Sequence, residues 1–340
     1  MRALPFAALL LAGCATTSAP LATEAPMVAA TAETDPVDTA ADAADDPAIW
    51  RNPADPSKSL VIGTDKKAGI HVYSLAGKRL SFTPAERLNN VDLRDTGARV
   101  IAAASDRADV ATAHVSLFTL DTAAAKLVPL GRFPVGAGEA YGMCLWTRAR
   151  DHALFGFIVL KDGRIDQVAI DLSGATPKVT TVRSIKLATQ SEGCVVDDRT
   201  GQLYVAEEDV GLWRFDADPS AATTATAIAK VDGKTLVADA EGLALAPSGR
   251  SGGYLVASSQ GDNAYTLYRL PGVTYAGRFR IGGGAIDGTS DTDGIDLMLG
   301  NFGPAYPRGL LVAQDGDNAP ATQNFKYVSW DAVRRALKLR

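Results

Sequence analysis

The chain has 340 residues with a net charge of −5, and 46% of its residues are hydrophobic while 21% are charged. This composition is that of a globular protein with enough apolar residues to bury a large core. The mild acidic balance gives no overall attraction to nucleic acid, so we expect no nucleic-acid partner.

The N-terminal segment has the pattern of a bacterial export signal. Arg2 precedes an apolar run over residues 3–11, which is too short to span a bilayer, and the run ends in Leu11-Ala12-Gly13-Cys14. This pattern predicts a lipoprotein-type signal peptide over residues 1–13 and lipidation of Cys14. The alternative is an ordinary signal peptide that contains a cysteine. A lipid group would tether the exported protein to the cell envelope without a membrane-spanning segment, whereas the alternative predicts secretion.

Residues 14–41 are rich in Ala, Thr, Pro and acidic residues and show little periodicity. They predict a flexible tether, followed by one domain over residues 42–340. Two further cysteines, Cys144 and Cys194, each lie in an apolar stretch. Export permits a disulfide between them, but the apolar surroundings favour two buried free thiols.

From residue 45 onward, short apolar runs alternate with turn clusters that contain Asp, Asn or Gly, a pattern typical of strands joined by hairpins. A similar strand pair, whose second strand ends in an aromatic residue, recurs at 61–73, 203–215 and 254–268. Similar units spaced by tens of residues favour β-propeller blades over a β-sandwich. We therefore predict an all-β propeller, although these loose repeats do not give the number of blades.

Carboxylates stand beside glycine at many predicted strand ends. One such group is typical of a solvated turn, but a propeller would bring six of them around one axis. Converging carboxylates repel one another unless hard cations lie between them, and oxygen ligands select Ca²⁺. The groups are Asp45-Asp46, Glu192-Gly193, Glu207-Glu208-Asp209, Asp239-Ala240-Glu241-Gly242, residues 287–294, and Asp315-Gly316-Asp317.

A second set of predicted strand ends and turns carries cations, namely Lys66, Lys67, Arg107 and Lys161. Any one of them alone is typical of a surface. Gathered near a calcium-binding face, they would suit a polyanionic ligand.

In chain order, these motifs resemble the β-propeller phytases, a family of alkaline, calcium-dependent 3-phytases. The resemblance extends from about residue 42 to residue 330. The matching stretches include Asp45-Asp46-Pro47-Ala48-Ile49-Trp50, Gly63-Thr64-Asp65-Lys66-Lys67, Leu88-Asn89-Asn90-Val91-Asp92, Tyr141-Gly142, Asp287-Gly288-Thr289-Ser290-Asp291-Thr292-Asp293-Gly294 and Gln323-Asn324-Phe325-Lys326.

The resemblance implies a six-bladed β-propeller that uses several catalytic and structural Ca²⁺ ions to release phosphate from phytate. The implied active-site calcium ligands are Asp45, Glu192, Glu208, Asp239, Glu241 and Asp287, with Asp291 or Asp293. The implied structural calcium ligands are Asp46, Asn90 and Asp315. The implied phosphate-binding residues are Lys66, Arg107, Tyr141 and Lys161, with Lys67 holding a neighbouring phosphate. Nothing in the sequence asks for more than a monomer.

Two alternatives remain open. One is a different calcium-dependent propeller hydrolase of the lactonase or phosphotriesterase type, which would have no use for basic residues around its metal. The other is a non-catalytic, surface-tethered propeller that binds a partner and uses calcium only for stability. Calcium-dependent phosphate release distinguishes both from the phytase hypothesis.

Overall fold

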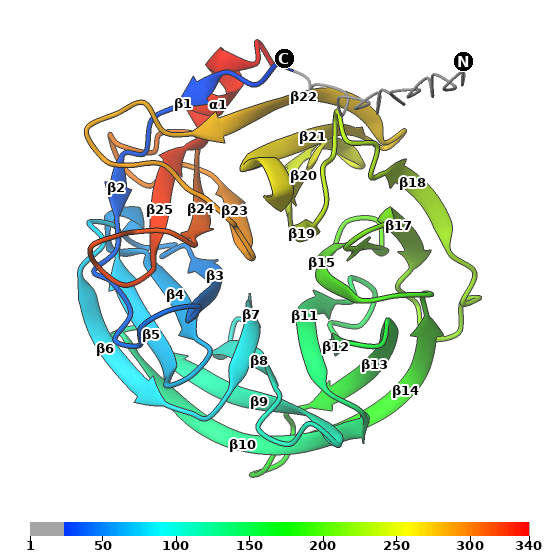
Figure 1. Cartoon of the computed structure of the whole chain (residues 1–340). Helices are drawn as coiled ribbons and strands as arrows, with labels where there is room; N and C mark the ends of the chain where they lie inside the picture. The colour runs from blue at the N-terminus through cyan, green and yellow to red at the C-terminus, as the bar shows by residue number, and fades with distance from the viewer. Residues whose placement is uncertain (1–23, 340) are drawn as a thin grey trace, which may run out of the picture.

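The structure is a computed structural model that describes residues 24–339. Six small sheets stand around a central axis like the blades of a propeller, and Figure 1 shows the ring viewed along that axis. This confirms the predicted all-β, six-bladed fold. Cys14 and the predicted signal peptide lie outside the described residues.

Each of the first five blades is a meander whose first strand lies nearest the axis. Blade 1 contains β3 (Ala44–Trp50), β4 (Leu60–Asp65), β5 (Gly69–Ser74) and β6 (Arg79–Pro84). Blade 2 contains β7 (Leu88–Asp95), β8 (Val100–Asp106), β9 (Thr112–Asp121) and β10 (Lys126–Ala137). Blade 3 contains β11 (Ala140–Thr147), β12 (Leu154–Leu160), β13 (Arg164–Asp171) and β14 (Lys178–Lys186). Blade 4 contains β15 (Ser191–Asp197), β16 (Gln202–Glu207), β17 (Gly211–Asp216) and β18 (Thr226–Lys230). Blade 5 contains β19 (Ala240–Ser248), β20 (Gly252–Ser259), β21 (Ala264–Leu270) and β22 (Thr274–Ile281).

The N-terminal segment closes the ring. Blade 6 contains β23 (Ile295–Leu299), β24 (Gly309–Asp315) and β25 (Asn324–Ser329), and its outermost strand is β2 (Ala32–Glu33), antiparallel to β25. The preceding strand β1 (Met27–Val28) adds to blade 5 in parallel with β22. The helix α1 (Trp330–Ala336) follows β25, and two 3₁₀ turns, η1 (Pro56–Lys58) and η2 (Gln260–Asp262), lie in blades 1 and 5.

The expectation of a flexible tether over residues 14–41 is therefore wrong for the part that the structure describes. Val28 and Val37 are buried, with 4% and 2% of their surface exposed. Blade 6 draws only three strands from the C-terminal end of the chain, so its outer edge is paired by the N-terminal segment instead. The propeller begins at Met27 and not at residue 42.

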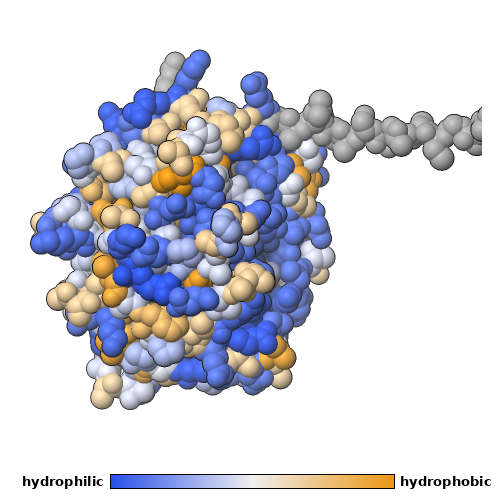
Figure 2. Space-filling view, turned by 60° about the vertical axis from the view of Figure 1, so that its left-hand side comes forward, coloured by the Kyte–Doolittle hydropathy of each residue, from blue (hydrophilic) through white to orange (hydrophobic). Residues whose placement is uncertain are grey.

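The apolar core lies between the blades. One cluster packs Ile62 and Val72 of blade 1 against Leu88 and Ala104 of blade 2, and similar clusters fill the other interfaces. In the view of Figure 2, hydrophilic residues cover most of the face, and hydrophobic ones form small separate groups. Among the described residues, no helix is long and apolar enough to cross a membrane.

The inner strands of neighbouring blades approach one another closely at glycine residues. A Cβ atom on Gly142 would lie 1.9 Å from the carbonyl oxygen of Glu192. A Cβ atom on Gly193 would lie 2.2 Å from the carbonyl oxygen of Glu241. Such distances exclude any side chain, so glycine is what lets the inner strands converge at this end of the channel.

Cys144 in β11 and Cys194 in β15 form a disulfide with a Cα–Cα distance of 5.7 Å. The expectation of two free thiols is therefore wrong. Both cysteines are buried, as their apolar surroundings indicated, but they lie on the inner strands of adjacent blades and face each other across the interface. The bond joins blade 3 to blade 4.

Candidate functional site

The site is built from two positions that recur from blade to blade. The first is the second residue of each inner strand in blades 1–5, where a β-bulge interrupts pairing with the second strand. Blade 6 places Asp293 at the equivalent point, immediately before Gly294. We call these residues the axial ring: Asp45, Asn89, Tyr141, Glu192, Glu241 and Asp293.

The second position immediately follows the second strand of each blade. In blades 1–5 the backbone N–H of this residue donates a hydrogen bond to a backbone carbonyl oxygen over 2.7 to 3.1 Å. The acceptor residue lies two positions before the axial-ring residue of the same blade. We call these residues the mouth ring: Lys66, Arg107, Lys161, Glu208 and Gln260. Because the same hydrogen bond recurs, both rings have fixed places at the same end of the channel.

Three glutamates from the two rings form a buried acidic cluster. Glu192, Glu208 and Glu241 each offer a carboxylate oxygen, and these oxygens lie within 4.8 Å of one another. Oε1 of Glu208 and Oε2 of Glu241 are buried without a hydrogen-bond partner. Unpartnered carboxylate oxygens are costly to bury, so the residues present fit a bound hard cation.

Burial and mutual repulsion act together on this cluster. Burial raises the pKa of Glu192 well above its usual range, and the nearby Asp45 raises it further. Burial likewise raises the pKa of Glu241, followed by the charge of Glu192. Burial also raises the pKa of Glu208 and of Asp239. A bound cation would offset both the burial of these carboxylates and their mutual repulsion.

On the opposite side of the ring, one ammonium group is shared by three carboxylates. Nζ of Lys66 lies 2.7 Å from Oδ1 of Asp42 and 3.0 Å from both Asp45 and Asp293. These charges raise the pKa of Lys66 despite its burial, so the side chain is cationic. Burial, with the charge of Asp45 second, raises the pKa of Asp293 to about 7.

Tyr141 stands between two cations. The guanidinium carbon of Arg107 lies 5.7 Å from the centre of its ring, and Nζ of Lys161 lies 5.1 Å from it. Its hydroxyl lies beside the carboxylate of Glu192, and burial followed by that charge raises its pKa, so it stays protonated. Arg107 also lies 3.7 Å from Glu139.

One polar cavity of about 650 Å³ lies at the mouth of the channel, and its lining residues do not include the predicted site residues Asp45, Arg107, Lys161 and Glu192. Cavities of this size hold small organic ligands. Residues of blades 1 and 3 to 6 line it, and the predicted site residues among them are Lys66, Tyr141, Glu208, Asp239, Glu241, Asp291 and Asp293.

Other predicted site residues lie elsewhere. Asp287 and Asp315 do not line this cavity, because both form ion pairs with the buried ammonium of Lys326. Burial raises the pKa of Asp315 to about 6. The side chain of Lys67 is exposed, and its Nζ donates to the carbonyl oxygen of Ala40.

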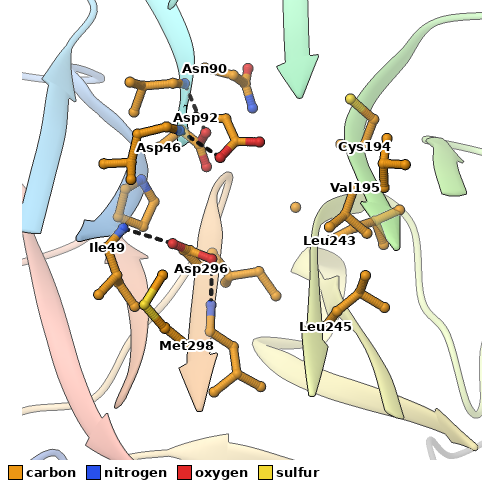
Figure 3. Close-up of a pocket in the computed structure, with 18 of the residues that line it drawn as sticks. Asp46, Ile49, Asn90, Asp92, Cys194, Val195, Leu243, Leu245, Asp296 and Met298 are labelled. Carbon is orange, nitrogen blue, oxygen red and sulfur yellow. Dashed lines mark hydrogen bonds between the residues drawn. The ribbon is translucent and has the colours of Figure 1, made fainter. Parts of the chain in front are cut away.

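Asp46 and Asn90 line a second cavity of about 360 Å³, further along the inner strands. Figure 3 shows acidic residues on one side of this cavity and apolar residues such as Val195 and Leu243 on the other. The carboxylates accept backbone N–H groups of the following blade. Asp46 accepts from Val91 over 2.9 Å, Asp92 from Leu145 over 2.8 Å, and Asp296 from Ile49 over 2.7 Å.

Sequence reasoning missed three polar residues that hold the site together. Nδ2 of Asn89 donates to Oδ1 of Asp45 over 3.1 Å and to Oε1 of Glu192 over 2.7 Å. Gln190 donates to Glu208, and Gln260 donates to Asp293, each over 2.8 Å. Aligning the inner strands on their Glu-Gly and Asp-Gly pairs would have identified Asn89 as the member from blade 2.

Fold and site together define a six-bladed propeller whose channel mouth combines buried carboxylates with basic side chains. The sequence model of the family described as Phytase matches residues 3–339. The 3-phytase of Bacillus subtilis (strain 168) is 42% identical over 329 residues, which cover 91% of this chain and 85% of that protein. The chain belongs to the phytase family.

Proposed function

We propose that the protein is a calcium-dependent phytase that hydrolyses phosphate monoesters of phytate. The observation that carries the proposal is that basic and acidic residues of the mouth ring come from different blades. Blades 1 to 3 contribute Lys66, Arg107 and Lys161, whereas blade 4 contributes Glu208 beside the unpartnered oxygen of Glu241. One cavity thus offers the Lys66 ammonium for a phosphate and carboxylates for a metal, while Arg107 and Lys161 flank Tyr141 in its wall.

Calcium is the cation that the ligand set favours, because every available donor is an oxygen. Glu192, Glu208 and Glu241 would hold it, with Asp239 beside them and with Asp45, Asp291 and Asp293 available to further ions. Bound calcium would supply positive charge against the phosphate oxygens and lower the pKa of the attacking water.

The basic residues would bind and orient the substrate. Arg107 and Lys161 flank Tyr141, so a phosphate above that ring would meet two cations and a hydroxyl donor. Lys66 would contact the same phosphate from blade 1, and Lys67 would reach a neighbouring one. Fixed positive groups stabilise the extra charge on phosphate in the transition state. Water serves as the nucleophile, so no covalent intermediate with the protein is needed.

The remaining predicted calcium ligands stay proposals, Asp287 for an active-site ion and Asp46, Asn90 and Asp315 for structural ions. Asp46 and Asn90 would hold a calcium in the channel, and their side chains line the same cavity. Asp287 and Asp315 would act near the closure of the ring, where Lys326 lies between them.

The proposal is tested against the alternative hydrolases by a substrate panel. The purified full-length protein should release phosphate from phytate in calcium and show no turnover of lactones or phosphotriesters. Turnover of a lactone or triester without phosphate release would replace the phytase assignment by the other hydrolase class. A folded protein that turns over none of them would favour a binding function.

The predicted export route adds a cellular proposal. Cys14 would be lipidated and would anchor the protein to the cell envelope as a monomer. Radiolabelled palmitate should enter the wild-type protein and not the Cys14→Ser variant. Equal labelling of both, or of neither, would contradict the anchor.

A further inference from the structure

We propose that the disulfide between Cys144 and Cys194 positions Tyr141 against Glu192 and thereby tunes the calcium cluster. The proposal rests on the proposed function, since it assigns these two residues to the active site. Tyr141 comes three residues before Cys144 in β11, and Glu192 comes two residues before Cys194 in β15. The covalent bond therefore joins the two strands that carry Tyr141 and Glu192.

Comparison of the blades shows what the disulfide replaces. Cys144 occupies the place in blade 3 that Asp92 occupies in blade 2 and Asp296 in blade 6, counting from the axial ring. Both aspartates bind a backbone N–H of the next blade. Cys144 makes a bond to the next blade as well, but a covalent one. In blades 2, 3 and 6, the residue at this position therefore links its blade to the next one around the ring.

The interfaces between blades 4 and 5, 5 and 6, and 6 and 1 have a backbone hydrogen bond between blades that the interface between blades 3 and 4 lacks. The N–H of Ala240 donates to Glu208, that of Gly242 to Asp293, and that of Gly294 to the carbonyl of Asp45. Among the described residues, no backbone hydrogen bond joins β11 to β15. The disulfide is therefore the principal link between these inner strands near the channel mouth.

The separation of these strands bears directly on the site. Gly142 already approaches the carbonyl of Glu192 so closely that no Cβ fits, and the Tyr141 hydroxyl lies beside the Glu192 carboxylate. Without the disulfide, the strands can move apart at this contact. Glu192 would then leave its place beside Glu208 and Glu241, and calcium affinity would fall.

The test measures calcium binding in Cys144→Ala, Cys194→Ala and the double variant. Each change breaks the same bond, so all three should weaken calcium binding equally, by about tenfold, as outer ligand-orienting groups do. Isothermal titration with calcium alone reads this without turnover. Effects that add in the double variant, or calcium affinities within about twofold of wild type, would overturn the proposal.

Two further variants separate positioning from stability. Val205→Ala loosens the same core cluster and leaves the disulfide intact, so it should lower the melting temperature without changing calcium affinity. If the alanine variants fail to fold, Cys144→Val with Cys194→Ile places there the residue types that blades 4 and 6 carry at these positions. That variant should fold and still show the tenfold loss, and retention of wild-type affinity would overturn the proposal.

Kinetics add a second readout. Since Tyr141 would contact the phosphate, loss of the disulfide should also raise KM at saturating calcium, whereas lost stability alone would leave KM unchanged. Absence of phytate hydrolysis in the wild type would contradict the proposed function, and the calcium titrations would still decide the role of the disulfide.

Discussion

Lys66 and Asp293 are 227 residues apart in the chain, yet Nζ of Lys66 lies 3.0 Å from Oδ2 of Asp293. The pair spans the joint between blade 1 and blade 6, where the two ends of the propeller meet. Asp45 binds the same ammonium group. The site is therefore complete only when the ring is closed.

Closure depends on the N-terminal strands, and this gives a first prediction. A chain that starts at residue 42 lacks β1 and β2, the buried Val28 and Val37, and the contact of Glu33 with Lys326. Each buried valine contributes at least about 1.5 kcal/mol, so the free energy of unfolding should fall by about 3 kcal/mol or more. Denaturant unfolding measures it, with a chain that starts at residue 24 as the control. Equal stability of the two chains would show that the strands do not close the ring.

The acidic cluster gives the second prediction. Glu241→Gln removes a charged ligand whose Oε2 has no partner in the protein, and Asp239→Ala removes its neighbour. Each should lower phosphate release from phytate by about 100-fold or more, and calcium affinity by about tenfold or more. Glu86→Gln alters an exposed carboxylate and should change neither. Near-normal activity of Asp239→Ala would contradict the site assignment.

The cationic half of the mouth gives the third prediction. Lys161→Met and Arg107→Met should each lower kcat/KM for phytate by about 100-fold, because they remove charge that stabilises the transition state. Calcium affinity in titrations without substrate should stay near the wild-type value. Lys178→Met changes an exposed lysine of the same blade and serves as the control. A loss of calcium binding equal to the loss of activity would move these residues out of the phosphate site.

Asn89 gives the fourth prediction, because its amide lies between two carboxylates of the axial ring. Asn89→Leu leaves Asp45 and Glu192 without this donor and should cost about 1–3 kcal/mol of stability, measured in chelator. Asn89→Asp adds a third charge and should be more destabilising in chelator but recover in calcium. Asn301→Asp, on an exposed loop, is the matched control. Equal melting temperatures of Asn89→Asp and wild type in chelator would refute the role of the amide.

The raised carboxyl pKa values predict a pH dependence. Asp293 has a pKa of about 7, above the value of about 4 in an unfolded chain, because of burial and then Asp45. Its contribution to stability is complete below about pH 4 and is lost as the pH rises through about 7. Calcium binds the ionised carboxylates, so calcium affinity should rise over the same range. Melting temperatures in chelator should therefore fall with pH, while the increase produced by calcium grows. An increase that shrinks as the pH rises would contradict this assignment.

Much of the site was predictable because single residues carry a strong signal. Glu192, Glu208 and Glu241 were identified from carboxylates at predicted strand ends, and the structure brings one carboxylate oxygen of each within 4.8 Å of the others. Lys161 was identified among the basic residues at predicted strand ends, whereas Tyr141 depended on resemblance to a family, since nothing in its local sequence indicates that the two meet.

The features that sequence reasoning missed depend on contacts between segments that are far apart in the chain. The disulfide requires knowing that the inner strands of blades 3 and 4 lie side by side, which neither cysteine reveals alone. The composition of residues 24–41 indicated a tether because their few large apolar residues are buried only against distant segments, in blades 1, 5 and 6. The pairing of Asp287 and Asp315 with Lys326 likewise depends on the closed ring.

The most direct test is the rate of phosphate release from phytate by the purified protein as free calcium is raised and then removed with excess chelator. The account predicts no release in chelator, a saturable rise with calcium, and full reversal on chelation. Release that is unchanged by chelation of a folded protein would contradict the central claim that the acidic and basic halves of the channel mouth act together through calcium.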